Sequence, residues 1–188
     1  VTGQHRPAKS NDDVKFLQSS GKTVNFFPKN LEKFFKNLET IWLNGAKLRE
    51  ISSEDLKVFT KLKRFSIGYN EVEVIEADLF KSNANLEWID LESNKIKHVE
   101  NGAITGLKNL KEFYFNGNPC HSGGAGSIKF VTPLANLVEG KCKDVFYVVK
   151  NLQDETQKRL SKLEAEILQL KLDCKCGVTQ LKKIDELF

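Results

Sequence analysis

The sequence predicts an α/β solenoid in which successive strands lie parallel, followed by a cap and a long amphipathic helix. Three observations predict it. Apolar positions recur every 24 residues, two cysteines flank an apolar segment after the last repeat, and the composition changes beyond Cys142. A fixed period of roughly 20 to 50 residues indicates a repeat architecture, so this period decides how the remaining sequence is interpreted.

The repeat emerges when the segments that begin at Leu38, Leu62, Leu86 and Leu110 are aligned without gaps. Each follows the pattern L-x-x-L-x-L-x-x-N-x-L, with Ala46 in place of the asparagine in the first of these segments. A weaker unit precedes them, carried by Val14, Leu17 and Val24. No unit can bury its apolar side alone, so we expect about five stacked units to share one core.

The alternation within each unit predicts a strand with one buried face. Ile89 and Leu91 alternate with Trp88 and Asp90, which is the period of two that a half-buried strand requires. Asn94 follows where the chain must turn, and its short amide can bond neighbouring backbone groups. A helical repeat is the alternative, but the β-branched and aromatic residues in the alternation favour strands.

This pattern resembles the leucine-rich repeat family, in the 24-residue form typical of extracellular proteins. The resemblance covers residues 14–119 and implies parallel strands on a concave face. Two positions depart from it, since Lys22 and Ala46 replace the turn asparagine, and we expect these turns to be less well ordered. Residues 1–13 lack the cysteines of the family's N-terminal cap and form a polar tail or a cap of another kind.

Residues 120–143 are predicted to form the C-terminal cap that an open stack needs. A glycine-rich turn at 123–126 leads into an apolar segment, Ile128 to Val138, which we expect to form a short helix over the last core layer. Cys120 and Cys142 bracket this segment, as in the caps of secreted family members. The resemblance implies a disulfide between them, worth about 3 kcal/mol on the chain-entropy model. Two buried free thiols are the alternative.

Residues 144–188 are predicted to form an amphipathic, coiled-coil-like helix. Its apolar residues alternate spacings of three and four, as a heptad seam does; they are Leu160, Leu163, Ile167, Leu170 and Cys174. The narrow stripe favours a partner helix over packing on the chain's own solenoid. Cys174 or Cys176 is expected to form the covalent link. In the competing account Gly177 breaks the helix, residues 178–188 fold back, and both cysteines are used within the chain.

The combination of repeats, cap and cysteine-bearing helix resembles the secreted leucine-rich immune proteins of mosquitoes and related insects. Those proteins form disulfide-linked complexes through such helices and engage complement-like proteins. The resemblance implies a secreted recognition protein of innate immunity that binds a protein ligand and forms homo- or hetero-oligomers through the helix. A secreted salivary or matrix repeat protein, with its helix packed intramolecularly, is the alternative. Four cysteines without a C-x-x-C spacing or nearby histidine pairs also favour disulfides, and hence an oxidising compartment, over a metal site.

Other classes of function are disfavoured by the sequence. The net charge of +4 is mild and dispersed, so nucleic acid is not expected as the main partner. No apolar run approaches the length of a membrane span. The segment at Gly123–Ser127 lacks the strand–turn–helix context of a nucleophile elbow or phosphate loop. Asp90 and Glu92 are interpreted as ordinary exposed carboxylates. We therefore expect no enzyme, no metal and no cofactor.

The candidate ligand site lies in the strand columns that face away from the core. Both tryptophans project there, and neighbouring strands about 4.8 Å apart would join their side chains into one patch. Trp, Tyr and Arg are also the residues enriched at binding hot spots. The predicted binding residues are Phe16, Trp42, Arg64, Tyr69, Trp88, Asp90 and Tyr114. The alternative is that large aromatic side chains merely cover the sheet, with Arg64 stacked between the indoles.

Overall fold

The computed structural model describes residues 10–21 and 23–185, apart from the side chains of residues 20, 128, 146, 171 and 173–185. The chain divides into two units, of which the first ends at Asp144 and the second begins at Val145. The first unit is the repeat domain with its cap, and the second is the long helix α3 (Val145–Asp185).

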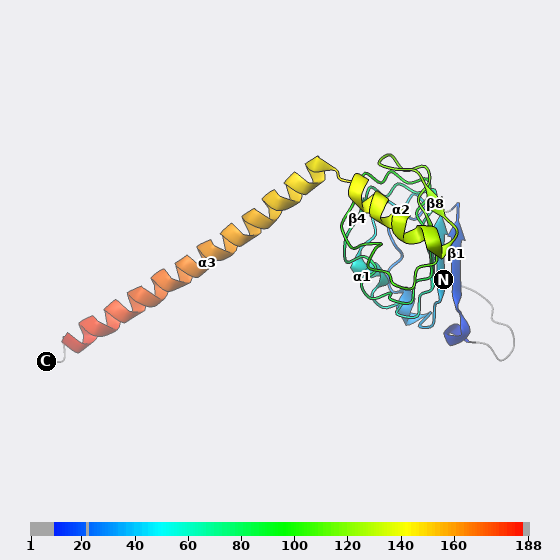
Figure 1. Ribbon diagram of the computed structural model, residues 1–188. Helices are drawn as coiled ribbons and strands as arrows, with labels where there is room; N and C mark the ends of the chain where they lie inside the picture. Colours follow the sequence, from blue (N-terminus) through cyan, green and yellow to red (C-terminus); the bar gives the residue numbers. More distant parts are fainter. Residues whose placement is uncertain (1–9, 22, 186–188) are drawn as a thin grey trace. The chain divides into compact units, whose positions relative to one another are not determined.

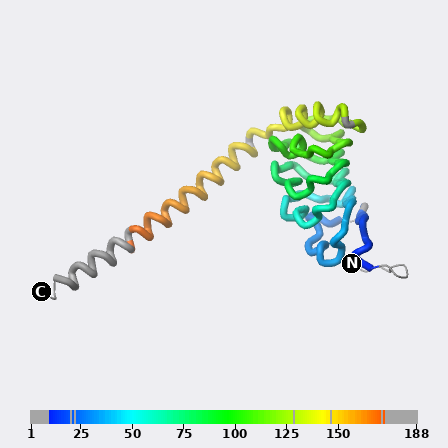
Figure 2. The backbone as a smooth tube through the Cα atoms, turned by 60° about the horizontal axis from the view of Figure 1, so that its bottom comes forward, coloured from blue at the N-terminus to red at the C-terminus, as the bar shows by residue number. Residues whose placement is uncertain are grey.

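The repeat domain is a stack of chain turns around one parallel sheet. Figure 2 shows these turns following one another from the blue N-terminal end to the green end, where α2 lies. Five strands pair in parallel: β1 (Phe16–Ser20), β2 (Thr40–Asn44), β3 (Arg64–Ser66), β5 (Trp88–Asp90) and β7 (Glu112–Tyr114). The predicted solenoid of five parallel strands is confirmed.

The strand register keeps equivalent residues of successive repeats side by side. Leu17 pairs with Ile41, Ile41 with Phe65, Phe65 with Ile89 and Ile89 with Phe113. The last four of these side chains are fully buried, whereas Leu17 is only partly buried against the core. The 24-residue period therefore becomes a set of apolar columns that run through the stack as one continuous core.

Buried asparagines tie each repeat to the one before it. Asn70 Oδ1 accepts hydrogen bonds from the backbone N–H groups of Ala46 (2.9 Å) and Leu48 (3.0 Å). Its Nδ2 donates to the carbonyl oxygens of Leu43 (2.7 Å) and Ile67 (2.8 Å). The Ala46 turn is thus held by the asparagine of the following repeat. Lys22, the other predicted weak turn, lies outside the described residues.

Turns and short elements complete the outer side of each repeat. They are the 3-10 helices η1 (Asn11–Asp13) and η2 (Leu31–Lys33), the helix α1 (Ser53–Leu56), and the two-residue strands β4 (Val74–Ile75) and β6 (His98–Val99). The two short strands pair in parallel as a second sheet. Because these elements are brief, their apolar residues rather than long helices complete the core, with Ile75 and Val99 fully buried.

The cap combines a sixth strand with a helix. We predicted a turn at 123–126, and this is wrong: Gly124–Ala125 forms β8, which pairs antiparallel with β7 and buries Ala125. The strand forms because the edge of β7 would otherwise expose unpaired backbone groups. Helix α2 (Ile128–Lys141) follows, and Figure 1 shows it beside β8. A disulfide joins Cys120 to Cys142, with an S–S distance of 2.03 Å, as predicted.

A carboxylate on α2 fixes the cap to the last complete repeat. Glu139 is almost fully buried. Its Oε1 accepts the N–H groups of Ile104 and Thr105, both at 2.8 Å. Its Oε2 accepts the Gly102 N–H and the Thr105 hydroxyl, both at 2.9 Å. The sequence analysis passed over Glu139, although it interrupts the apolar face formed by Val131, Ala135, Val138 and Cys142.

Helix α3 is continuous over 41 residues and passes through Gly177 without a break. The hairpin that we considered as an alternative is therefore absent up to Asp185. The predicted seam residues Leu160, Leu163, Ile167 and Leu170 are each about half exposed. The side chains of Cys174 and Cys176 lie outside the described residues. None of the described helices carries an apolar stretch that could cross a bilayer.

Candidate functional site

The concave face of the main sheet carries the predicted residues in two columns. Phe16, Arg64 and Trp88 lie in the first column, and Trp42 and Tyr114 lie in the second. The columns follow directly from the pairing of residues 24 apart in the parallel register. The structure thus brings together all the strand residues that the sequence assigned to one patch, and their role in binding stays a prediction.

Four aromatic rings form an unbroken row across the sheet. Ring centroids are separated by 5.1 Å between Phe16 and Trp42, 6.1 Å between Trp42 and Trp88, and 5.8 Å between Trp88 and Tyr114. The two indoles meet although β3 lies between their strands, because Ser66 is small and fully buried at that point. We call this row the aromatic row. Such packed rings are favourable beyond their area burial.

Arg64 adds a positive charge to the aromatic row. Its Cζ atom lies 4.8 Å from the centroid of the Trp88 ring, within the range of a cation–π interaction. The sequence analysis placed Arg64 between the two indoles as an alternative; the measured stacking is on Trp88. The guanidinium remains exposed, so its hydrogen-bond donors can still reach a ligand.

One polar atom of the aromatic row has no internal partner. The Nε1 atom of Trp42 is buried and finds no hydrogen-bond acceptor among the described residues. A buried donor without an acceptor costs about 1 to 3 kcal/mol relative to a satisfied one. Dense ring packing at this face is therefore maintained at a local cost in stability.

Asp90 does not lie exposed as predicted. It is only 9% exposed, and its Oδ2 lies 2.8 Å from Ser66 Oγ while its Oδ1 accepts the Glu92 N–H at 2.9 Å. Burial raises its pKa, and the hydrogen bonds from Glu92 and Ser66 oppose that rise. The alternating pattern placed Asp90 on the correct face, but the turn after β5 closes over its carboxylate. The Asp90 carboxylate therefore accepts hydrogen bonds within the protein and is not a surface group.

Tyr69 follows β3 by three residues and has an unusual backbone conformation. Its φ is 59°, in the left-handed region, and its side chain is 65% exposed. The equivalent positions in other repeats also have positive φ, but they are the smaller residues Gly21, Gly45, Ser93 and Gly117. A bulky residue with positive φ is an outlier, and such outliers cluster at functional sites. This observation supports the prediction that Tyr69 contacts the ligand.

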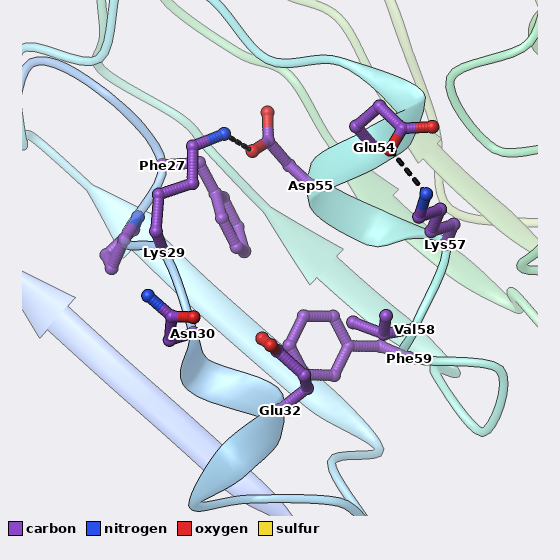
Figure 3. A pocket seen from close by; sticks show the side chains of 10 residues that line it. Phe27, Lys29, Asn30, Glu32, Glu54, Asp55, Lys57, Val58 and Phe59 are labelled. Atoms are coloured by element: carbon purple, nitrogen blue, oxygen red, sulfur yellow. Dashed lines mark hydrogen bonds and ion pairs between the residues drawn. The ribbon is translucent and has the colours of Figure 1, made fainter.

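A cavity that was not predicted lies in the first repeats, beside the helix α1. It has a volume of 290 Å³, and Figure 3 shows its apolar floor at Phe27 and Phe59. Lys29 pairs with Asp55 at the rim. Burial acts to raise the pKa of Asp55, but the hydrogen bond from Lys29 acts to lower it, and the pKa lies below its ordinary value. Lys57 likewise pairs with Glu54, so four of the cavity's ionic groups already bind one another. No sequence pattern indicated it, since it forms between turns of irregular structure.

Comparisons with known proteins agree with this geometry. The leucine-rich repeat family model matches residues 60–119. The crystal structure of the leucine-rich repeat domain of APL1, a mosquito protein, aligns with a TM-score of 0.53 at 19% sequence identity. The fold is a leucine-rich repeat solenoid. The alignment covers 57% of this chain and 28% of the APL1 chain, so the two share only part of that protein's length.

Another leucine-rich repeat structure, that of a TLR13–ssRNA13 complex, aligns with a TM-score of 0.46 at 23% identity and covers 50% of this chain and 14% of the other. No curated protein matches the sequence. The family-model match and the APL1 alignment establish the leucine-rich repeat fold, whereas the site rests on the residues described above. Within the described residues, no group of three or more His, Cys, Asp or Glu side chains is placed to hold a metal ion.

Proposed function

We propose that this leucine-rich repeat protein is a secreted, non-enzymatic recognition protein that binds a protein ligand on its concave face. The observation that carries the proposal is the aromatic row of Phe16, Trp42, Trp88 and Tyr114, with Arg64 stacked on it. Interface hot spots are enriched in Trp, Tyr and Arg. Both tryptophans of the chain lie in this row, and neither belongs to the hydrophobic core.

Secretion and a role in innate immunity complete the proposal. The disulfide between Cys120 and Cys142 supports secretion, because disulfides persist in oxidising compartments. The immune role is supported by the resemblance of the whole arrangement, repeats followed by a bridged cap and a seam-bearing helix, to secreted immune proteins of insects. The ligand would then be a protein met in an extracellular fluid.

The test replaces Trp88 with alanine and measures retention of proteins from the extracellular fluid of the source organism. A hot-spot role predicts a loss of about 2 kcal/mol, or roughly 30-fold in affinity. The matched control is Phe34→Ala, which removes an aromatic ring that is 45% exposed away from the concave face. Equal retention of the same proteins by wild type and by both variants would refute the concave site. Unfolding of Trp88→Ala alone would show that the ring is structural.

We further propose that α3 assembles with a second copy of itself in parallel. The seam residues Leu160, Leu163 and Ile167 are exposed on a helix whose polar face is charged. With Leu160 at heptad position a and Leu163 at position d, Arg159 is at position g and Glu164 is at position e. In a parallel pair, a g residue of one helix approaches the e residue five positions later on the other helix. That rule places Arg159 beside Glu164 of the second helix, which is an attractive pair. Cys174 continues the seam in sequence and is the residue proposed to link the copies.

Gel mobility without reductant tests this assembly. The wild type is expected to run as a dimer that dithiothreitol converts to monomer, and Cys174→Ser with Cys176→Ser should abolish the dimer band. Circular dichroism of the double variant is expected to show an intact repeat domain. A wild type that is monomeric both on the gel and in sedimentation would contradict the proposal. A linked partner of different mass would show that the assembly is heteromeric.

A further inference from the structure

Charges beside the concave face neutralise one another almost completely. Residues immediately before the strands alternate in sign from repeat to repeat, so that Glu39 pairs with Lys15 (2.6 Å) and Lys63 (2.8 Å), and Glu87 pairs with Lys111 (2.8 Å). Hydrogen bonds from Lys15 and then Lys63 lower the pKa of Glu39 to about 2. We call this alternating set the rim ladder. It leaves little net charge along that edge of the face.

Besides the buried Asp90, two charged residues within the face itself lack an ionic partner. No carboxylate lies within ion-pair distance of the Arg64 guanidinium, and no basic group lies so close to the Glu112 carboxylate, among the residues that the structure describes. Glu112 instead accepts the Tyr114 hydroxyl at 2.9 Å, a hydrogen bond that raises the pKa of Tyr114. The face thus presents one free positive and one free negative group to a ligand.

The register fixes how far apart the backbones of Arg64 and Glu112 lie. Arg64, Trp88 and Glu112 occupy one column on three neighbouring strands, so the two charged residues flank the indole. Two inter-strand spacings of about 4.8 Å separate them by roughly 10 Å at the backbone. A ligand that meets Arg64 and Glu112 above their own strands would offer opposite charges at about this spacing, with apolar groups between them for Trp88.

We propose that the concave face binds a polyproline II segment that carries an acidic and a basic side chain three residues apart. This proposal rests on the concave binding site proposed above and specifies the chemistry of the ligand that the site would bind. A polyproline II helix has three residues per turn and rises about 3.1 Å per residue, so residues i and i+3 project from one side about 9 Å apart. In a β-strand the same-side spacings are about 7 and 13 Å, and neither fits.

The parts of the segment would bind as follows. Its carboxylate pairs with Arg64, whose planar fork suits a carboxylate. Its ammonium or guanidinium pairs with Glu112. Proline rings between them lie against Trp88, as such segments do in other aromatic-lined sites. The rings of the aromatic row are tilted against one another by 38° and 48° at Trp88, which gives ridges for small rings to contact.

Synthetic peptides without tryptophan test the inference, because the chain's two tryptophans then report binding at this face alone. The matched probe contains Glu-Pro-Pro-Lys within a glycine–serine frame. The first control contains Glu-Pro-Lys with the second proline moved outside the charges, and so changes only the spacing. The second control contains Glu-Pro-Pro-Glu. We expect a saturable change of tryptophan emission with the matched peptide and at least five-fold weaker binding of both controls.

Variants of the protein separate the site from general electrostatics. Arg64→Gln and Glu112→Gln should each weaken the matched peptide at least five-fold. Lys111→Gln, which removes a charge that is already paired in the rim ladder, should leave its affinity within two-fold. Equal binding of the matched and spacing peptides, no effect of Arg64→Gln, or no saturable response to any peptide would each overturn the inference.

Failure here is distinguishable from failure of the proposed function. If Trp88→Ala loses the natural protein ligand while Arg64→Gln and Glu112→Gln retain it, the concave site stands and the charge pattern is wrong. If Trp88→Ala retains that ligand, the concave site itself fails.

Discussion

Removal of the Glu139 carboxylate is expected to detach the cap from the repeat stack. Glu139 accepts four hydrogen bonds from the segment Gly102–Thr105. In Glu139→Gln the amide NH2 group can occupy only one carboxylate oxygen position, and there it faces two donors. The change therefore loses two hydrogen bonds and brings donors into opposition without altering the size of the side chain.

The magnitude follows from which donors become stranded. Hydrogen bonds to a charged group contribute about 1.5 to 3 kcal/mol each, and a donor left buried costs about 1 to 3 kcal/mol. The Ile104 N–H is buried, whereas Gly102 and Thr105 are exposed and can bind water instead. The amide therefore keeps its oxygen on the buried Ile104 N–H and turns its NH2 toward the Gly102 N–H and the Thr105 hydroxyl. Counting these two lost hydrogen bonds at about half their value, because their donors can reach water, we expect Glu139→Gln to lower the free energy of unfolding by about 2 kcal/mol.

Urea unfolding followed by tryptophan emission measures this loss, and hydrogen exchange of the Gly102 amide locates it. Thr105→Val is the matched control, since it removes one hydroxyl bond and should cost only about 1 kcal/mol. A Glu139→Gln protein within 0.5 kcal/mol of the wild type, with the Gly102 amide still protected from exchange, would refute the reasoning.

Two further predictions concern the repeat domain. Asn94→Ala should lower the free energy of unfolding by about 2 to 3 kcal/mol, because Asn94 accepts the Val72 N–H at 3.1 Å and donates to the Ile67 carbonyl at 2.9 Å inside the stack; Asn109→Ala, at an exposed position, should change it by less than 0.5 kcal/mol in the same urea titration. Burial, followed by Lys143, lowers the pKa of His98 below its ordinary value of 6.5, so the stability from its neutral form is full above pH 6.5 and decreases as the pH falls below it. Thermal melts from pH 7.5 to 5 should show this decline, and a His98→Gln protein that declines with the same slope would contradict it.

The period of 24 residues was enough to predict the fold and the register of the concave face. Because buried apolar residues recur at one spacing, only one parallel alignment keeps them all inside, and that alignment also fixes which side chains face outward. Trp42, Arg64, Trp88 and Tyr114 were placed together on this basis. The spacing could not show how far each side chain is covered, which is why Asp90 was predicted to be exposed.

The remaining differences arise from tertiary contacts that local patterns do not encode. Gly124 and Ala125 have weak strand propensity, yet they form β8 because the edge of β7 offers unpaired backbone groups. Gly177 was considered a break, but one glycine costs a helix only about 1 kcal/mol, too little to interrupt 41 residues. Glu139 could have been suspected as a lone acid on an apolar helix face. Its four donors come from a segment that the sequence separates from it by more than thirty residues.

Three departures from stable design coincide on the concave face. Tyr69 adopts a left-handed conformation where glycine or serine occupies the equivalent positions, Trp42 buries an indole N–H without an acceptor, and Arg64 stays unpaired beside a rim ladder in which neighbouring charges are paired. At the Tyr69 position, for example, a glycine such as Gly45 of the preceding repeat would adopt the same conformation with less strain. Local rules that fail together at one surface indicate that this surface is specialised for something other than stability. Binding of a ligand that satisfies the free charges and covers the rings is the function that would account for all three.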